Sequence, residues 1–560
     1  MTDTLRAANT AGFATAGTID AVTLRTWLND ADEIALFDVR EAGQFGEGHL
    51  FFAVPLPYSR LELDVTRLAP RRDVRVVLVD DSDGVAEKAA RRLASLGYTW
   101  VSVLAQGVHG WSAAGYTLFK GVNLPSKTFG ELVEHAYDTP RISASELARR
   151  QAAGEKLALL DGRTFEEHRK MTIPGAISCP NGELAYRLDE LVALSDTTIV
   201  VHCAGRTRSI MGAQTLRNLG VENPILALEN GTQGWFLAGL QLEHGSTRRY
   251  PETVTDEALG QARRRVAALR ERGGVTTLTA RAAQDWLDDV RRTTLVLDVR
   301  TPDEFARDPV TGSYSAPGGQ LLQATDQYIG VRKSRVLLID DDGVRAPVIA
   351  HWLVKMGLEA AVVTPETRHE LRLPSAAAAR SGASLPRLDA AALRALVARD
   401  QAFVSIDLRS SAQYRRSHAS GARWAIRPTL DRLLAQNVAR TSSPVVLLFA
   451  DSIELAELAA LDLQEAGAHP IYLAGDGLDA WRDAGLSIVD SAEQPDDSER
   501  IDYLFFVHDR HEGNAQAARD YLAWETGLLA QCAPDELGVF QLVDDRPIGG
   551  TGARSLSSDH

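Results

Sequence analysis

Four copies of one sequence unit follow one another in this chain of 560 residues. Each copy has an apolar run that ends in Asp-x-Arg, and a second apolar run whose next residue lies 42 or 43 positions beyond that aspartate. The four aspartates are Asp38, Asp161, Asp298 and Asp407, and the residues after the second run are Asp80, Cys203, Asp340 and Ala450. A glycine suited to end a helix comes 17 positions later in every copy. A spacing that recurs four times predicts four repeats of one structural unit.

Each unit alternates short apolar runs, rich in β-branched residues, with longer segments of helical spacing. This alternation is typical of an α/β fold in which helices cover both faces of a parallel sheet. We therefore predict four tandem three-layer α/β/α domains with parallel sheets, followed by a C-terminal helical tail. Because ligands of such sheets bind at the carboxyl ends of the strands, the residue after the second run is the first candidate for a functional site.

The second copy places a cysteine at this position. The run 199–201 predicts a buried strand that ends next to Cys203, and the spacing of residues 210–219 predicts a helix after it. A thiol there faces the N–H groups of the loop and of the helix N-terminus, which stabilise negative charge. Arg206 and Arg208 add positive charge, so we expect a lowered pKa and a nucleophilic thiolate at Cys203. The alternative is a small buried apolar residue.

The candidate site is the loop between this strand and this helix. Cys203 is the candidate catalytic residue. The candidate substrate-binding residues, which would cradle an anion, are Ala204, Gly205, Arg206, Thr207, Arg208 and Ser209. The other cysteines are Cys179, which we expect to be buried, and Cys532, which has no informative context. Because the three cysteines lack metal-ligand spacing, we predict no metal site, and we expect no cofactor.

The other three copies lack the cysteine and are predicted to be structural or regulatory. Their loops begin Asp80-Asp81-Ser82-Asp83, Asp340-Asp341-Asp342 and Ala450-Asp451-Ser452. An aspartate cannot carry sulfur as a persulfide, and several carboxylates at a helix N-terminus repel an anion. The Asp-x-Arg motif recurs in all four copies, so we expect Asp161 and Arg163 to fix the strand end rather than to react. Strand alternation turns His202 away from the side chain of Cys203, which favours a packing role.

Charge and apolar content narrow the possible partners. With 60 Lys and Arg against 75 Asp and Glu, the net charge is −15, and an acidic surface repels nucleic acid. The sequence has no apolar stretch of membrane-spanning length, and its first residues do not resemble a signal peptide. We therefore expect no nucleic-acid or membrane partner and a cytoplasmic location, where reducing conditions keep a thiol free.

Together these features resemble the rhodanese family of sulfurtransferases. The resemblance rests on Cys203 with its six-residue loop, the upstream Asp-x-Arg, the turn Pro174-Gly175-Ala176 and the later Gly234-Trp235. It extends from Thr18 to about Asp490. It implies four tandem rhodanese-like domains, of which only the second is active.

The predicted domain boundaries follow from the repeats and from the segments between them. They are 18–122 for the first domain, 138–245 for the second, 250–274 for a helical linker, 275–373 for the third, 384–490 for the fourth and 491–560 for an acidic linker and helical tail. The helical linker is predicted to divide the chain into two tandem pairs. In tandem rhodaneses the catalytic cleft lies between paired domains, which implies a cleft between the first and second copies. Residues 514–529 have the spacing of a helix that packs against the domains.

The resemblance implies a sulfurtransferase that acts through a Cys203 persulfide. A small anionic donor, either thiosulfate or a related persulfide, would give its sulfane sulfur to Cys203, and a thiol, cyanide or a protein cysteine would accept it. Two alternatives remain open. One is a persulfide relay or scaffold that serves a protein partner. The other is a phosphatase of the same fold, but that loop needs an arginine at position 209, where this chain has Ser209.

Overall fold

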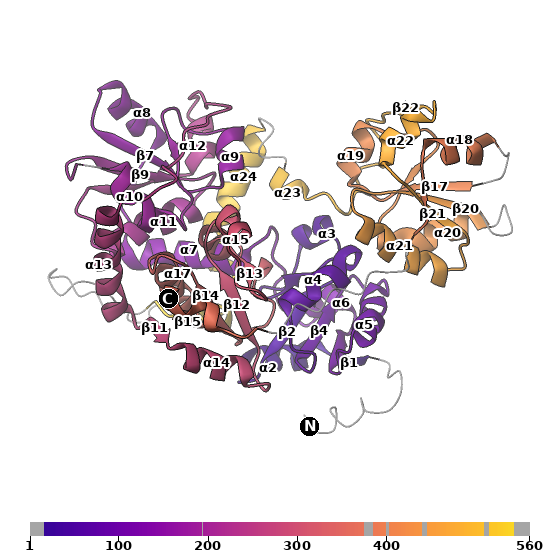
Figure 1. Ribbon diagram of the computed structural model, residues 1–560, viewed down its shortest axis with the longest axis horizontal. Coiled ribbons are helices and arrows are strands. Elements are labelled where there is room, and N and C mark those ends of the chain that lie inside the picture. Colours follow the sequence, from indigo (N-terminus) through magenta and orange to yellow (C-terminus); the bar gives the residue numbers. More distant parts are fainter. Residues whose placement is uncertain are drawn as a thin grey trace. The chain divides into compact units, whose positions relative to one another are not determined.

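The computed structural model describes residues 16–192, 194–373, 385–398, 403–438, 445–508 and 514–542. It contains four five-stranded sheets, within which all strand pairs are parallel. Counted within each sheet, the strand order is always first, fifth, fourth, second, third. This shared order confirms the predicted α/β fold of repeated units, and a helical C-terminal region is present (Figure 1). Residues 374–384, between the third and fourth copies, lie outside the described residues.

The first and fourth copies belong to one compact unit. The first copy comprises β1 (Gly17–Ile19), α2 (Ala21–Asn29), β2 (Ile34–Asp38), α3 (Ala42–Glu47), β3 (Val54–Pro55), η1 (Tyr58–Arg60), α4 (Leu61–Leu68), β4 (Arg75–Val79), α5 (Val85–Ser95), β5 (Val101–Leu104) and α6 (Gly107–Ala113). The fourth comprises β16 (Arg387–Leu388), α18 (Ala390–Ala398), β17 (Phe403–Asp407), α19 (Ser411–Arg416), β18 (His418–Ala419), β19 (Arg423–Trp424), η4 (Arg427–Thr429), α20 (Leu430–Val438), β20 (Val445–Phe449), α21 (Ile453–Glu465), β21 (Ile471–Ala474), α22 (Gly477–Asp483) and β22 (Ile488–Val489). In the fourth copy β18 and β22 form an additional antiparallel pair.

The second and third copies, except for residues 329–332, belong to the other compact unit. It begins with α7 (Leu124–Tyr137), and the second copy comprises β6 (Arg141–Ile142), α8 (Ala144–Ala152), β7 (Leu157–Asp161), α9 (Phe165–Lys170), β8 (Ile177–Ser178), α10 (Leu184–Leu191), β9 (Thr198–His202), α11 (Thr207–Asn218), β10 (Ile225–Leu228) and α12 (Gly231–Leu237). After α13 (Asp256–Gly273), the third comprises β11 (Thr276–Leu278), α14 (Ala280–Asp288), β12 (Thr294–Asp298), α15 (Pro302–Arg307), β13 (Tyr314–Ser315), α16 (Gly318–Gln323), η2 (Thr325–Gln327), β14 (Arg335–Ile339), α17 (Arg345–Lys355), β15 (Glu359–Val363) and η3 (Pro365–Glu370).

The remaining helices follow the four repeats. They are α23 (Phe505–His508), α24 (Ala515–Thr526), α25 (Leu528–Gln531) and α26 (Pro534–Leu537). The last three belong to the compact unit of the second and third copies, and α23 belongs to the other unit. Of the helices described, none combines the length and the apolar character that a membrane crossing requires.

The sheet of the second copy has an apolar core on each of its faces. Val201 of β9 packs in one core with Leu188 of α10 and Leu216 of α11. Its neighbour Val200 packs in the other core with Leu147 of α8 and Trp235 of α12. Successive residues of a strand point to opposite faces, so a run that is apolar throughout needs helices on both sides. The three-layer arrangement follows directly from this run.

The linker helix is present as predicted, but the prediction that it separates two tandem pairs is wrong. It is α13, whose Ala262, Val266 and Leu269 are buried in one cluster with Leu219 of the second copy and Val348 of the third. An amphipathic helix with residues of both copies on its apolar face joins them instead of spacing them apart. The second copy is therefore in one compact unit with the third, not with the first.

Buried charges join the first copy to the fourth. The guanidinium group of Arg427 donates to the carboxylate of Glu62 at 2.7 and 3.1 Å and to Asp462 at 2.8 Å. The hydroxyl of Tyr58 also donates to Asp462, at 2.9 Å. All four residues are buried, and each charge has an opposite charge beside it, as burial requires. Residues 365 positions apart in the sequence are thus direct partners.

Candidate active site

Cys203 follows the last residue of β9, the central strand of its sheet. The residue is only 2% exposed, and the hydroxyl of Ser209 donates a hydrogen bond to its Sγ at 3.1 Å. Ser209 lies in the first turn of α11, which begins at Thr207. The sulfur thus has a hydrogen-bond donor at the N-terminus of α11.

The first turn of α12 holds the beginning of the loop from the other side. The N–H of Thr232 donates to the carbonyl of Cys203 at 2.8 Å, and the N–H of Gln233 donates to the carbonyl of Ala204 at 3.0 Å. Gly231 has a φ of +51°, and a Cβ at this position would collide with the Cys203 carbonyl. Only glycine combines this backbone conformation with so close an approach. The backbone around the sulfur is therefore fixed by the first turn of α12.

Arg208 lies in the loop, and its guanidinium group is paired with a carboxylate. It donates to both oxygens of Glu167 in α9, at 2.7 and 2.8 Å. Although burial opposes the charge on Glu167, Arg208 lowers the pKa of this carboxyl to about 2. The carbonyl of Arg208 accepts a hydrogen bond from Asn181 at 2.8 Å. Glu167 was not predicted from the sequence, yet the third copy carries Glu304 and Arg345 at the matching positions, and this recurrence is a signal for the pair.

Arg206 points to a different partner. Its guanidinium group donates to both oxygens of Glu131 at 2.8 and 2.9 Å, and it also pairs with Glu134. Both glutamates belong to α7, which precedes the second copy. The structure therefore does not bring the two predicted arginines together around one anion, because each is held by carboxylates of a different helix.

Thr207 and Gly205 contact the tail helix α24. The hydroxyl of Thr207 donates to Glu525 at 2.9 Å, and the backbone of Gly205 lies against the same side chain. Neither contact was predicted, because nothing in the sequence connects a loop residue with a partner 318 positions away. All the residues from Ala204 to Ser209 except Arg206 are buried.

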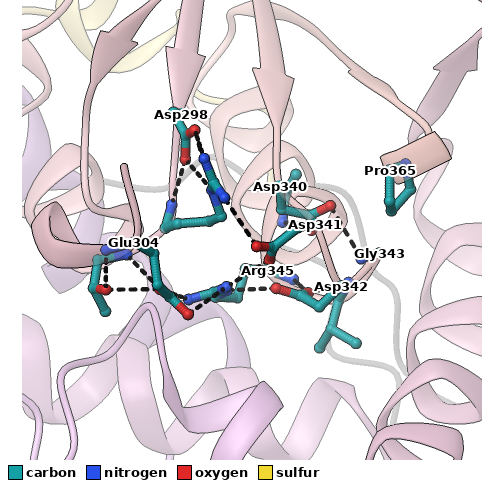
Figure 2. Close-up of polar contacts among 12 residues, drawn as sticks. Asp298, Glu304, Asp340, Asp341, Asp342, Gly343, Arg345 and Pro365 are labelled. Atoms are coloured by element: carbon teal, nitrogen blue, oxygen red, sulfur yellow. Dashed lines mark hydrogen bonds and ion pairs between the residues drawn. The ribbon is translucent and has the colours of Figure 1, made fainter. Parts of the chain in front are cut away.

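The loops of the first and third copies carry an aspartate at the position of Cys203 and bind its carboxyl group with their own N–H groups. Asp80 accepts hydrogen bonds from the N–H groups of Ser82 at 2.9 Å and Ala86 at 3.0 Å. Asp340 accepts them from Gly343 at 3.0 Å and Ala346 at 2.8 Å, and Figure 2 shows this carboxyl group turned toward the N–H of Gly343. These N–H groups belong to the loop and to the first turn of the next helix. In these two copies the turn therefore binds a carboxyl group at the position that Cys203 has in the second copy.

Comparison with known proteins gives the family. A family model for the rhodanese-like domain matches residues 20–114 and 143–238. A crystal structure of thiosulfate sulfurtransferase from Pseudomonas aeruginosa superposes with a TM-score of 0.85 and has 38% identity, over 94% of this chain and 99% of that one. The chain belongs to the rhodanese family.

Two curated proteins match it over shorter segments. The "HTH-type transcriptional regulator Rv0324" of Mycobacterium tuberculosis is 40% identical over 108 residues, which are 19% of this chain and 45% of that protein. The "Putative sulfur carrier protein YrkF" of Bacillus subtilis is 33% identical over 102 residues, which are 18% of this chain and 54% of that protein. This chain thus spans about half of the length of these two relatives.

The Asp-x-Arg motif is a structural element of each rhodanese domain. In the second copy Arg163 donates to both oxygens of Asp161, at 2.9 and 2.8 Å, and also to the carbonyl of Met171. The same pairs form in the other copies, where the arginine likewise reaches a carbonyl eight residues ahead. His202 is fully buried 3.9 Å from Asp161, and burial lowers its pKa to about 4. These contacts fix the strand end beneath the loop and fit the packing roles expected from the sequence.

The other two cysteines lie in surroundings that do not favour a thiolate. Cys179 is fully buried in an apolar core, and burial raises the pKa of its thiol well above the usual value. Burial also raises the pKa of Cys532, to about 12. Within the described ranges, no three His, Cys, Asp and Glu side chains are grouped so that they would hold a metal ion.

Placing a cysteine in the first rhodanese copy should not create a second active site. We expect Asp80→Cys to gain no sulfur adduct, because Asp83 stays in the loop and Val85 occupies the place of Arg208. Intact-mass spectrometry after thiosulfate treatment checks this, with Cys203→Ser added so that only the new thiol is present in a rhodanese loop. A sulfur adduct in that double variant would contradict the prediction.

Proposed function

We propose that this protein is a sulfurtransferase that takes the sulfane sulfur of thiosulfate onto Cys203 and passes it to a thiol or to cyanide. One observation carries the proposal. In two copies the turn after the central strand binds a carboxyl group at the position where the second copy has its thiol. A turn that accommodates a carboxyl group suits an anionic donor, and the cysteine supplies the nucleophile. The likeness to a thiosulfate sulfurtransferase over nearly the whole chain supports the same reaction.

The reaction has two displacement steps at sulfur. The Cys203 thiolate attacks the outer sulfur of thiosulfate, a new S–S bond forms, and the old S–S bond breaks with its electron pair leaving on sulfite. The acceptor thiolate or cyanide then attacks the terminal sulfur of the persulfide, and Cys203 leaves as a thiolate. The sulfane sulfur is transferred without net change in the enzyme, so the cycle needs no resident cofactor.

Three features of the site would serve these steps. The Ser209 hydroxyl, 3.1 Å from Sγ, would stabilise the thiolate both before attack and after release. The N–H groups of the loop and of α11 would bind the sulfonate group, on which charge builds as sulfite leaves. Arg208 would add positive charge to this region. A reducing compartment such as the cytoplasm would keep the thiol available.

The two arginines should differ in their effects on the reaction. We expect Arg208→Met to lower kcat/KM for thiosulfate by about 1–3 kcal/mol of transition-state stabilisation, because charge near the sulfur is lost. Arg206→Met should mainly lower the melting temperature, because it leaves Glu131 buried without its partner. Kinetics and thermal unfolding of both variants provide the check. Equal kinetic losses in the two variants would mean that the arginines only shape the loop.

The decisive test of the proposal is turnover with small acceptors. The full chain should form thiocyanate from thiosulfate and cyanide, and it should release sulfite in equal amount. A persulfide that forms but is discharged only by an added protein would favour the relay alternative. Hydrolysis of p-nitrophenyl phosphate without thiosulfate turnover would favour a phosphatase.

A further inference from the structure

The tail helix α24 comes from outside the four repeats and reaches the Cys203 loop with one carboxylate. Glu525 is 1% exposed. Its Oε1 accepts a hydrogen bond from the Thr207 hydroxyl at 2.9 Å and another from Nζ of Lys127 at 3.1 Å. Thr207 is the first residue of α11, and Lys127 belongs to α7. One buried side chain thus ties the tail to both the catalytic loop and the helix that precedes the second copy.

This contact depends on the absence of a side chain at residue 205. A Cβ on Gly205 would lie 2.9 Å from Oε2 of Glu525, and 3.7 and 3.9 Å from the side chains of Tyr521 and Leu522. The other copies carry Ser82, Asp342 and Ser452 at this position. The bare backbone of Gly205 lets the tail helix lie directly on the loop, and only the copy with the cysteine offers it.

The hydrogen-bond donor to Glu525 is equally specific to the active copy. The residues that match Thr207 are Gly84, Val344 and Glu454, none of which offers a threonine hydroxyl. Lys127 is buried as well, and its ammonium group lies over the rings of Tyr521 and Trp524, 5.0 and 5.6 Å from their centroids. The ion pair and these cation–π contacts hold α24 firmly in place.

We infer that Glu525 is a positioning residue for the sulfur-transfer site. By accepting the Thr207 hydroxyl it fixes the first turn of α11, whose N–H groups would bind the donor under the proposed function and whose Ser209 donates a hydrogen bond to the sulfur. A displacement of about 1 Å in a reacting site can cost about a hundredfold in rate, so such fixing has a measurable effect. The inference deepens the proposed function, on which its kinetic readout rests.

Three variants separate positioning from general stability. Thr207→Val removes the hydroxyl at nearly constant volume and leaves the Lys127–Glu525 pair intact. Glu525→Gln keeps an oxygen that accepts from Thr207. The double variant Lys127→Met/Glu525→Met removes the acceptor without leaving a buried charge unpaired. A matched control is Asp189→Asn, which breaks an ion pair with Arg265 between two other helices of the same unit.

The readouts are kcat and KM for thiosulfate, the rate constant for alkylation of Cys203 by iodoacetamide, and thermal unfolding. We expect Thr207→Val and the double methionine variant each to lose about tenfold, mainly in kcat, with a parallel change in alkylation rate. Glu525→Gln should stay within about threefold of the wild type, and Asp189→Asn should keep wild-type kinetics.

Two results would overturn the inference. One is wild-type kinetics and alkylation in Thr207→Val. The other is an equal loss in Asp189→Asn at a similar fall in melting temperature. If the double variant does not fold, Thr207→Val and Glu525→Gln still decide whether Glu525 positions the loop. If the wild type does not turn over thiosulfate, the proposed function fails, and the alkylation rates alone decide the positioning role.

Discussion

Replacing Cys203 with serine should abolish both the sulfur adduct and the turnover of thiosulfate. Treatment of the wild type with thiosulfate should add about 32 Da, the mass of one sulfur atom held as a persulfide. A serine hydroxyl stays protonated near neutral pH and does not attack sulfane sulfur, so Cys203→Ser should gain no mass. Intact-mass spectrometry and thiocyanate formation measure the two effects.

The remaining cysteines supply the controls for this experiment. Burial raises the pKa of both thiols, so Cys179→Ala and Cys532→Ser should keep the full adduct and the full turnover. Peptide mapping of the treated wild type should locate the added sulfur at residue 203. Sulfur transfer by Cys203→Ser, or an adduct on another cysteine with wild-type turnover, would disprove the assignment of the nucleophile.

Gly231→Ala should give the second-largest effect, although residue 231 carries no reactive group. Its left-handed backbone costs an alanine about 1–2 kcal/mol, and the new methyl group would also collide with the Cys203 carbonyl. Overpacking of this kind costs roughly 1–3 kcal/mol more. Because the collision displaces the backbone of the nucleophile itself, we expect kcat/KM for thiosulfate to fall by about a hundredfold.

Gly239→Ala is the matched control. Gly239 has a φ of +74°, but a Cβ there would meet no atom within 4 Å. This variant should lose only the backbone contribution to the free energy of unfolding and should keep wild-type kinetics. Urea unfolding and thiosulfate kinetics of the two variants separate strain from collision. Equal activities in the two variants would show that the Cys203 carbonyl tolerates displacement.

The sequence was informative wherever structure depends on local spacing. The recurring interval from Asp161 to Cys203 predicted the repeated units, because it runs from the end of β7 through α9, β8 and α10 to the end of β9. The apolar run before Cys203 predicted a strand covered on both faces. Both features depend on residues that are close in the chain or that recur in each copy.

Contacts between distant segments could not be predicted in the same way. Arg206 and Arg208 look alike in the sequence, but each faces a different helix, and the glutamates that pair with Arg206 lie 72 and 75 residues before it. The place of Arg206 depends on how α7 packs beside α11, and the linker did not indicate that the second and third copies share one unit. Packing of whole elements decided the contact of Arg206 and the pairing of copies, and no residue pattern near the loop records either.

The ion pair between Glu62 and Arg427 has a consequence for the time course of synthesis. These partners lie 365 residues apart, and a ribosome that adds about 5–20 residues per second needs roughly 20–70 s to pass from one to the other. During this interval Glu62 has, among the described residues of its own copy, only Arg92, 3.7 Å away, as an ion-pair partner. The nascent chain therefore carries an unfinished polar surface around Glu62 until the fourth copy supplies Arg427.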